Sequence, residues 1–416
     1  MTLKEKRRID QLRHGIVPEG YKRTKVGICP EDWVENVLGD IYTERKEPGN
    51  EGLPLLMVSI HSGVSDGEVG EKDLPKRFKR IEDKSQYKRA VVGDLVFNMM
   101  RAWQGAIGSV RTEGMVSPAY VVAKPNDMVD PLFMDYYMKT NRMVHTIHRQ
   151  SYGVTDFRLR LYWESFAPIP CVLPPAREQK KIAEILTTQD KVIELKGKLL
   201  AEKQQQKKYL MQQLLTGRKR LPGFVGKWKE DNLGALFTER VETNCEHMEL
   251  LAITGTQGVI PRCWLDLKDN SSEDKSKYLH ICFGDIGYNT MRMWQGVSAY
   301  SNYEGIVSPA YTILKPQNDI CAKYFSYLFK LPEIVFLFYR FSQGLVDDTR
   351  NLKYDNFKKI KVKFPNDESE QKAISKVFEA VDKEIELYQQ NLAQEKLKKK
   401  ALMQLLLTGI VRVKYE

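Results

Sequence analysis

The chain has few cysteines and no long apolar run, and these absences exclude several classes of protein. Its six cysteines are scattered over 416 residues, with no CxxC pair and no paired histidines close by. We therefore expect neither a zinc module nor a disulfide framework. The longest apolar run, Ile334 to Tyr339, is far too short to span a membrane, and the charged N-terminus lacks the apolar core of a signal peptide. These features predict a soluble protein of the reducing cytoplasm.

Catalytic signatures are missing as well. The sequence contains no GxxxxGK[ST], GxGxxG, HExxH or GxSxG motif. The segments Ser117–Tyr120 and Ser308–Tyr311 are similar to the (Asn/Asp/Ser)-Pro-Pro-(Tyr/Phe/Trp) loop of amino-methyltransferases, but both lack the second proline and a glycine-rich turn. We interpret them as strands that follow a proline-containing turn. His145 and His148 lack a third ligand and are interpreted as helix-surface residues, so we predict no catalytic residue and no metal ligand.

The composition describes a folded, basic protein without deciding its function. There are 65 Lys and Arg against 54 Asp and Glu, a formal charge of +11, and 42% of the residues are hydrophobic. This length predicts two or three domains, each with its own core. The positive excess suits a polyanionic partner, although many proteins that never touch nucleic acid carry a similar charge.

The chain contains an internal repeat. Residues 82–125 align without a gap on residues 273–316, and 22 of the 44 positions are identical. The match continues upstream, where Trp33 corresponds to Trp228, and downstream, where residues 178–217 correspond to residues 370–409. Because repeats decide architecture, we expect two similar halves, each a globular block followed by a long helix.

Both expected helices carry a heptad-like seam with a polar middle. They begin just after proline and end at a Thr-Gly pair, and the first, from Ala176 to Thr216, would be about 60 Å long. Such seams are typical of coiled coils, and the two helices most simply pair with each other. The seam residues are Ile182, Leu186, Gln189, Ile193, Lys196, Leu200, Lys203, Lys207, Leu210 and Leu214, then Ile374, Phe378, Val381, Ile385, Tyr388, Leu392, Glu395, Lys399, Leu402 and Leu406.

The globular blocks have mixed patterns. Short apolar runs at residues 54–60, 90–98 and 116–123 predict strands, because they are broken by glycine, proline and aspartate. One helix per block is predicted, at Pro131–Arg149 in the first and at Lys323–Phe341 in the second.

The phrase that ends each helix carries a resemblance to a known family. Residues 210–224 read LMQQLLTGRKRLPGF and residues 402–409 read LMQLLLTG. With the duplicated blocks, this resembles the specificity subunit of type I restriction-modification enzymes, over nearly the whole chain. The resemblance implies an α+β fold with two tandem target recognition domains, each followed by a long helix, and the two helices pairing as an antiparallel coiled coil with pseudo-two-fold symmetry.

The same resemblance implies the function and the partners. Each domain would read one half-site of a split, double-stranded DNA target, and methyltransferase subunits, two in number, would dock on the helices. Restriction or translocase subunits could join the complex. The chain itself would be non-catalytic and hold no cofactor, with S-adenosylmethionine, ATP and Mg²⁺ belonging to the partner subunits. The corresponding boundaries are an N-terminal segment at 1–21, recognition domains at 22–170 and 218–362, and helical spacers at 171–217 and 363–416.

Four repeated polar residues are the first candidates for DNA contact. Arg101 and Gln104 recur as Arg292 and Gln295 beside a repeated tryptophan and glycine. Arginine can pair with guanine and glutamine with adenine in the major groove. The alternative is a fold-stabilising cluster around Trp103 and Trp294, two residues that we expect in the core.

Further candidates have weaker patterns. A loop with His61 and Ser62 corresponds to Thr256 and Gln257, and its divergence suits two different half-sites or simply a tolerant loop. Near the block ends, a glycine followed by arginine suits close approach to phosphate or base. Basic side chains there and in the preceding loop either contact phosphate or belong to solvated loops. These residues are Arg158, Arg160 and Arg350 at the block ends, and Lys79, Arg80, Lys84 and Lys275 in the loops.

Two other classes of function stay open on the residues alone. A stand-alone DNA modification enzyme would transfer methyl groups without partners. A coiled-coil scaffold whose blocks bind proteins would bind without regard to DNA sequence.

Overall fold

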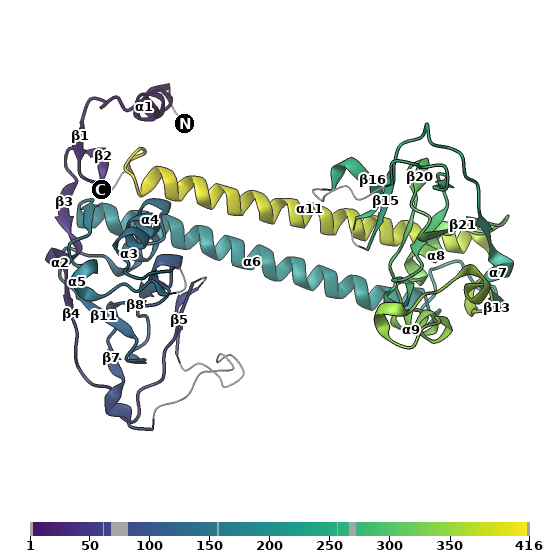
Figure 1. Cartoon of the computed structure of the whole chain (residues 1–416), viewed down its shortest axis with the longest axis horizontal. Helices are drawn as coiled ribbons and strands as arrows, with labels where there is room; N and C mark the ends of the chain where they lie inside the picture. The colour runs from purple at the N-terminus through teal and green to yellow at the C-terminus, as the bar shows by residue number, and fades with distance from the viewer. Residues whose placement is uncertain are drawn as a thin grey trace. The chain divides into compact units, whose positions relative to one another are not determined.

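A computed structural model describes residues 3–60, 62–67, 82–155, 158–255, 257–265 and 272–413. The chain divides into two units, each containing one globular block and part of each long helix (Figure 1). Unit 1 comprises residues 1–196 and 391–416, and unit 2 comprises residues 197–390. None of the helices in the described ranges is long and apolar enough to cross a membrane.

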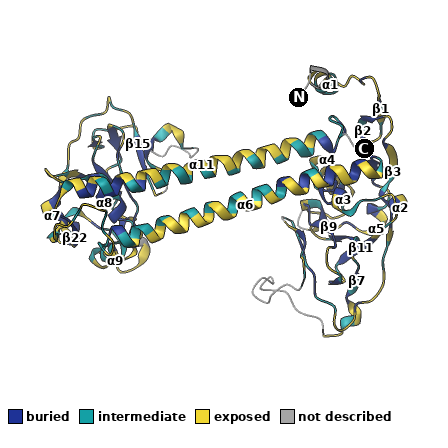
Figure 2. Cartoon of the chain, turned by 180° about the vertical axis from the view of Figure 1, so that it is seen from behind, coloured by how far each residue is buried: buried dark blue, intermediate teal, exposed yellow. Residues whose placement is uncertain are grey.

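The two long helices are α6 (Ala176–Leu214) and α11 (Glu368–Leu406), each of 39 residues. Each follows a proline, and the turns after them contain Gly217 and Gly409 at φ +73° and +70°, the left-handed conformation that ends a helix. Helix α6 ends two residues before the predicted Thr216. Buried apolar residues lie only near the ends of the two helices, and the middle of each helix is half-buried or exposed (Figure 2).

Ion pairs between α6 and α11 occur in both units. In unit 1, Glu395 accepts hydrogen bonds from Gln189 and Lys196, both at 2.8 Å. In unit 2, Lys203 pairs with Glu384 at 2.8 Å, and Lys207 pairs with Asp382. The polar middle of the predicted seam therefore consists of side chains that bind across the helix pair.

Unit 1 is built on a four-stranded antiparallel sheet in the order β4-β11-β8-β9. Small two-stranded sheets, β5-β6, β7-β10, β3-β12 and β1-β2, surround it. The elements of its block are α1 (Leu3–Arg13), β1 (Tyr21–Thr24), β2 (Gly27–Pro30), β3 (Val34–Val37), α2 (Leu38–Ile41), β4 (Tyr42–Glu44), β5 (Val58–Ser59), β6 (Gly63–Val64), η2 (Lys84–Gln86), β7 (Lys88–Ala90), β8 (Leu95–Asn98), η3 (Ala102–Gln104), β9 (Ile107–Ser109), β10 (Gly114–Val116), β11 (Tyr120–Pro125), α3 (Pro131–Tyr137), α4 (Asn141–Gln150), α5 (Trp163–Phe166) and β12 (Pro170–Leu173).

Unit 2 repeats this sheet as β14-β21-β18-β19, in the same register. Val121 faces Phe97 in unit 1, and Thr312 faces Tyr288 at the equivalent place in unit 2. The elements of its block are β13 (Trp228–Asn232), α7 (Leu233–Leu236), β14 (Phe237–Arg240), β15 (Leu251–Thr254), β16 (Gly258–Pro261), η5 (Arg262–Trp264), β17 (Leu279–Ile281), β18 (Ile286–Asn289), η6 (Met293–Gln295), β19 (Ser298–Tyr300), β20 (Gly305–Val307), β21 (Tyr311–Pro316), α8 (Ala322–Leu328), α9 (Pro332–Phe341), η7 (Asp347–Thr349), α10 (Tyr354–Phe357) and β22 (Lys361–Pro365).

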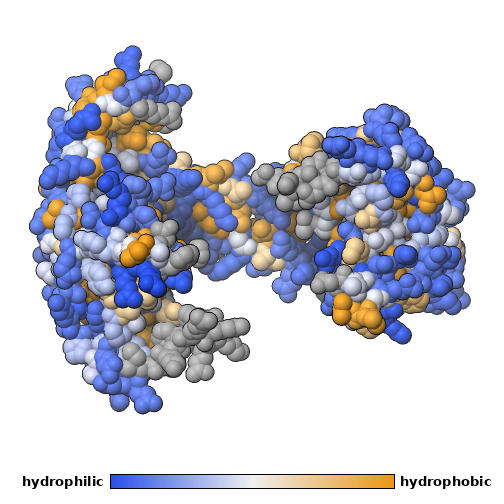
Figure 3. All heavy atoms as spheres, viewed as in Figure 1, coloured by the Kyte–Doolittle hydropathy of each residue, from blue (hydrophilic) through white to orange (hydrophobic). Residues whose placement is uncertain are grey.

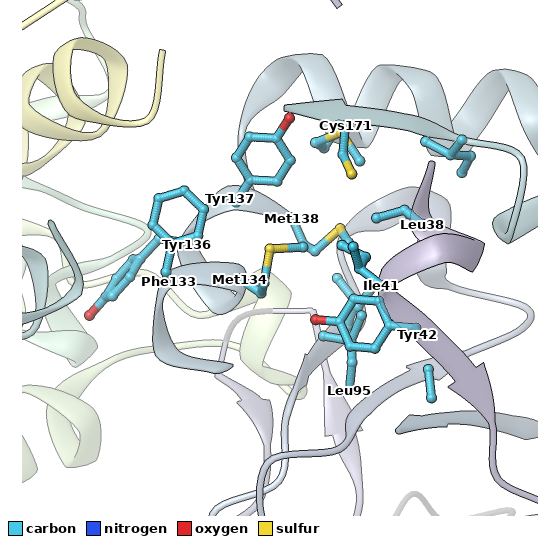
Figure 4. Packing of buried hydrophobic residues seen from close by; sticks show 14 of the residues in the cluster. Leu38, Ile41, Tyr42, Leu95, Phe133, Met134, Tyr136, Tyr137, Met138 and Cys171 are labelled. Atoms are coloured by element: carbon cyan, nitrogen blue, oxygen red, sulfur yellow. The ribbon is translucent and has the colours of Figure 1, made fainter. Parts of the chain in front are cut away.

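The central sheet of unit 1 is buried on both faces. Alternate residues of β11 point to opposite sides, so Val121 and Ala123 join one core while Tyr120 and Val122 join another. Figure 4 shows the first core, where Met134 and Met138 lie between Tyr42 and Tyr137. Strands β11 and β21 begin at Tyr120 and Tyr311, directly after the Ser-Pro-Ala turn, as predicted.

The single helix predicted in each block is wrong, because two helices occupy each segment. In unit 1 the break lies between α3 and α4, where the Thr140 side chain caps the amide of Met143 at 3.4 Å. In unit 2, α9 begins at Pro332, whose ring cannot continue the preceding helix α8. The spacing of apolar residues continues across both breaks, so the sequence pattern did not reveal them.

Much of the repeated sequence serves the fold. The Arg45 guanidinium donates to Asp94 at 2.7 and 3.2 Å, and Arg240 donates to Asp285 at 2.8 and 3.4 Å. Both carboxylates are buried, and desolvation raises the pKa of Asp94. Forked pairing of this kind satisfies a buried carboxylate, which explains why both residue types recur in the two halves.

The start of each long helix is tied to a segment from the end of the other. In unit 1, the buried Glu178 of α6 accepts hydrogen bonds from Trp33 at 3.1 Å and from Arg412 at 2.7 and 2.8 Å. In unit 2, Glu370 of α11 accepts two from Arg220, at 2.5 and 2.6 Å. The repeated glutamates are therefore structural anchors.

Candidate nucleic-acid interface

The predicted Arg and Gln pairs lie on short turns that follow a central strand in each unit. In unit 1, Asn98 at the end of β8 accepts a hydrogen bond from the amide of Met100 at 3.0 Å, and η3 then ends at Gly105 with φ +97°. In unit 2, Asn289 and Met291 repeat the bond at 3.0 Å, and η6 ends at a glycine with φ +80°. Only glycine adopts this conformation without strain, which accounts for its repetition.

The turns have nearly the same backbone conformation and present the same side chains. Arg101 lies at φ −132° and ψ 6°, and Arg292 at φ −127° and ψ 2°. All four side chains, including Gln104 and Gln295, are exposed, and none forms a hydrogen bond or ion pair within the part of the chain that the structure describes. Their donors and acceptors are therefore available to an external partner.

Trp103 and Trp294 support these turns. They were predicted to be core residues, but both are only half-buried. Each indole donates its N–H to the carbonyl oxygen of the exposed methionine before it, at 3.1 and 3.0 Å. Each indole also packs against a second ring. The ring centres of Trp103 and His148 in α4 are 5.4 Å apart, and those of Trp294 and Tyr339 in α9 are 6.2 Å apart. One edge of each indole therefore stays at the surface.

The block-end segment lies against the turn in each unit, next to Arg101 in unit 1 and next to Arg292 in unit 2. The amide of Leu161 donates to Met99 at 2.9 Å, and the amide of Leu352 donates to Thr290 at 2.8 Å. In unit 1 this leaves a surface hollow of about 450 Å³ lined by Met100, Tyr152, Gly153, Val154, Arg158, Leu159, Arg160 and Tyr162. The exposed Arg158 and Arg160 are therefore close to the Arg101 turn.

The glycines of this segment serve the chain itself. A Cβ on Gly153 would lie 2.6 Å from the backbone of Arg158, and one on Gly344 would lie 2.7 Å from the Thr349 carbonyl oxygen. Arg350 is also engaged internally. It donates to Asp347 at 3.0 Å and to Tyr339 at 2.8 Å, with its guanidinium 4.0 Å from the centre of that ring.

The candidate loop that contains Ser62 in unit 1 and Gln257 in unit 2 forms the tip of a hairpin in each unit. Ser62 and Gln257 are exposed beside the left-handed glycines of β5-β6 and β15-β16. Each tip lines a cleft, of about 430 Å³ in unit 1 and about 420 Å³ in unit 2. The Ile60 carbonyl oxygen would lie 3.9 Å from a Cβ on Gly105, so this hairpin also approaches the Arg101 turn.

Several candidates cannot be placed or lie elsewhere. His61, Thr256, Lys79 and Arg80 fall outside the described residues. Lys84 lies in η2 with its ammonium 5.4 Å from the centre of the Tyr87 ring. Lys275 occupies the corresponding turn before β17 and is half-buried.

Sequence reasoning missed two groups of residues around the turns. The first is a pair of half-buried lysines at equivalent positions, Lys139 and Lys330. Burial lowers the pKa of both, to about 8 for Lys330, which donates to the Gly296 and Ser298 carbonyl oxygens at 2.6 Å. The two lysines are as far apart in sequence as residues 82 and 273, where the aligned repeats begin. This equal spacing could have identified them.

The second missed group is apolar and exposed. Figure 3 shows a largely hydrophilic face with small hydrophobic patches on both units. The exposed apolar side chains of the turns and their neighbours are Met100, Tyr152, Val154 and Tyr162 in unit 1, and Met291, Phe336, Leu345 and Val346 in unit 2. Only the two methionines were marked by the repeat, because the others differ between the halves.

Comparisons with known proteins agree with this organisation. Residues 269–396 match the family model described as the type I restriction modification DNA specificity domain. The chain is 25% identical to the putative type I restriction enzyme MjaX specificity subunit of Methanocaldococcus jannaschii, across 95% of this chain and 97% of that protein.

Solved structures share the fold at low sequence identity. A chain from a study of complex assembly and conformational transition of the type I R-M system has a TM-score of 0.56 at 16% identity, covering 92% of this chain and 99% of that one. The HsdS subunit of Thermoanaerobacter tengcongensis gives 0.51 at 15%, covering 92% and 98%, and the type I S subunit of M. genitalium gives 0.54 at 13%, covering 92% and 97%. These findings confirm the predicted resemblance to the specificity subunits of type I restriction-modification enzymes.

Proposed function

We propose that this chain is the non-catalytic DNA sequence-recognition subunit of a type I restriction-modification complex, and that it reads a split target with one half-site per block. One observation carries the proposal. The same turn, with an exposed arginine and an exposed glutamine, occurs once in each unit. A duplex whose two strands are related by a two-fold axis offers two similar surfaces to such a duplicated reader.

The arrangement of side chains at each turn suits base reading. Arginine can donate two hydrogen bonds to guanine, and glutamine can pair with both edge groups of adenine. The neighbouring Arg158 and Arg160 would hold the phosphate backbone in unit 1. The hairpin tips with Ser62 and Gln257 differ between the units, which suits half-sites that share some bases and differ at others.

We further propose the tandem architecture that the family implies. Recognition domains at 22–170 and 218–362 would follow the N-terminal segment 1–21, and the segments 171–217 and 363–416 would form an antiparallel coiled coil with pseudo-two-fold symmetry. The ion pairs of Lys196 with Glu395 and of Lys203 with Glu384 support this pairing. On this model the helices set the gap between half-sites.

The partners follow from the same proposal. Two methyltransferase subunits would dock on the helical spacers, and restriction or translocase subunits would join them. S-adenosylmethionine, ATP and Mg²⁺ would be bound by those partner subunits, leaving this chain to supply double-stranded DNA recognition alone.

Arginine-to-alanine substitutions in the complex test the proposal. Arg101→Ala should relax one base position in one half-site, and Arg292→Ala should relax the equivalent position in the other half-site. A lost bidentate contact costs about 1–3 kcal/mol of discrimination, or about 5-fold to 150-fold in relative affinity. Binding to a randomised DNA library, read by sequencing, measures both changes.

Arg350→Ala is a matched control, because this arginine bonds within its own unit. It should lower stability and leave base preference unchanged. If Arg101→Ala alters both half-sites or neither, the modular reading model is wrong. If circular dichroism shows that Arg101→Ala disrupts the fold, the arginine belongs to the structural cluster around Trp103 instead.

A further inference from the structure

A cluster of three side chains that can bind a metal lies in unit 2, at the β17-β20 pair. His280 is in β17, Cys282 follows that strand, and Glu304 precedes β20. The ligand atoms of these three residues all lie within 4.8 Å of one another. Pairing of β17 with β20 sets His280 opposite Ile306 and so brings together residues that are far apart in sequence.

The three atoms form a triangle of suitable size for a metal ion. His280 Nε2 is 3.1 Å from Glu304 Oε1 and 3.6 Å from Cys282 Sγ, and Sγ is 4.0 Å from the same Oε1. The circle through these atoms has a radius of about 2.1 Å, close to the zinc bond lengths of about 2.0–2.3 Å for nitrogen, oxygen and sulfur ligands. Cys282 Sγ is also 3.9 Å from His280 Nδ1, so it lies off the axis of the Nε2 lone pair, and the cysteine side chain would have to turn for one ion to bind all three atoms.

A further carboxylate contacts the other ring nitrogen of the histidine. Glu242 Oε2 lies 2.8 Å from His280 Nδ1, the ring nitrogen that does not contact Glu304. A proton on Nδ1 donated to Glu242 leaves the Nε2 lone pair free for a metal, an arrangement common around zinc-bound histidines. Glu242 is held in turn by Arg240, at 2.8 Å.

The cysteine is also held in position. Its backbone amide donates to Asp285 at 2.9 Å, and Asp285 is fixed by Arg240. Metal binding would release the thiol proton to solvent and leave a thiolate ligand.

Unit 1 provides an internal reference for this cluster. At the equivalent place, Arg89 lies between Glu47 and Glu113, with contacts of 3.1 and 2.8 Å, and Val91 replaces the cysteine. A guanidinium neutralises the two carboxylates but cannot bind a metal. Unit 2 keeps both carboxylates and replaces the cation and the valine with two metal ligands.

We propose that unit 2 binds one Zn²⁺ ion through His280, Cys282 and Glu304, with Glu242 orienting the histidine and water in the fourth position. A thiolate, an imidazole and a carboxylate together favour zinc over Mg²⁺ or Ca²⁺, which prefer oxygen ligands. The ion would join β17 to the segment before β20, and this binding is independent of DNA reading.

The experiment compares zinc binding by the full chain and by variants that restore the unit 1 residues. His280→Arg and Cys282→Val should keep the fold, since unit 1 already uses these side chains, and Cys263→Ser is a control at an exposed cysteine outside the cluster. After dialysis against a chelator and reloading with Zn²⁺, mass spectrometry of bound metal should find one ion per chain in the wild type and control. The two variants should retain less than a tenth of it.

Two further measurements separate this site from adventitious binding. Co²⁺ should give a thiolate-to-cobalt charge-transfer band that Cys282→Val abolishes, and Glu242→Gln should weaken Zn²⁺ binding about 10-fold to 100-fold. Zinc content equal in the wild type and Cys282→Val, or a charge-transfer band that persists in that variant, would overturn the proposal. His280 would then only contact the two carboxylates, in the place that Arg89 occupies in unit 1.

Discussion

Removing Arg412 should weaken unit 1 selectively. Its guanidinium donates two hydrogen bonds to Glu178, which is fully buried. Among the residues that the structure describes, only Trp33 would remain as a side-chain partner after Arg412→Ala. Breaking a buried ion pair from one side costs about 3–5 kcal/mol. Because the Arg412 side chain is 31% exposed, we take the lower end, about 3 kcal/mol. The exposed contact with Asp32 adds little.

Native-state hydrogen exchange measures this loss where it occurs. A cost of about 3 kcal/mol corresponds to exchange about 150 times faster for amides that open with the start of α6. The strands of the unit 2 sheet should keep their protection. Arg220→Ala should produce the converse pattern, since Arg220 pairs with Glu370 within unit 2.

Arg412→Lys is the matched control. Lysine keeps the positive charge but cannot form the two guanidinium hydrogen bonds to Glu178, so the loss of protection should be smaller than with alanine. Equal losses of protection in both units after Arg412→Ala, or no loss near α6, would refute the assignment of Glu178 as a buried anchor.

Two further predictions concern charge. Hydrogen bonds from Lys196 and Gln189 lower the pKa of Glu395 to about 2, so its stabilising effect is complete above the ordinary value of 4.5 and is lost as the pH falls toward 2. Glu395→Gln should therefore reduce the acid sensitivity of the helix pair in unit 1, followed by circular dichroism. Lys79→Ala should weaken binding to all DNA sequences equally and reduce the salt slope by about one, measured by fluorescence anisotropy; a loss confined to one sequence would contradict a phosphate contact.

The sequence predicted the two long helices well, because repeated identity and heptad spacing are read directly from residue order. The helices begin and end close to the predicted positions, and the polar seam residues Gln189, Lys196 and Glu395 bind across the helix pair in unit 1. The breaks at Thr140 and Pro332 were missed because a cap or one proline changes the backbone without changing the apolar period.

The candidate site could be predicted only in part. The repeat marked Arg101 and Arg292, but the same repeat also marked Arg45 and Asp94, which are buried partners. Identity between the halves cannot distinguish a shared fold from a shared surface. Likewise, cysteine spacing gave no sign of a metal cluster, because strand pairing rather than sequence distance brings the ligands of unit 2 together.

The tie between Glu178 and Arg412 also gives the two units different folding schedules. Unit 2 is continuous in sequence, whereas unit 1 needs a segment 234 residues beyond its first helical anchor. At about 5–20 residues per second, the ribosome takes about 10–50 s to supply that segment. Until then, a nascent unit 1 holds a buried carboxylate without its cation and an α6 seam without its partner. Unit 2 is fully synthesised at residue 390, 22 residues and about 1–4 s before Arg412.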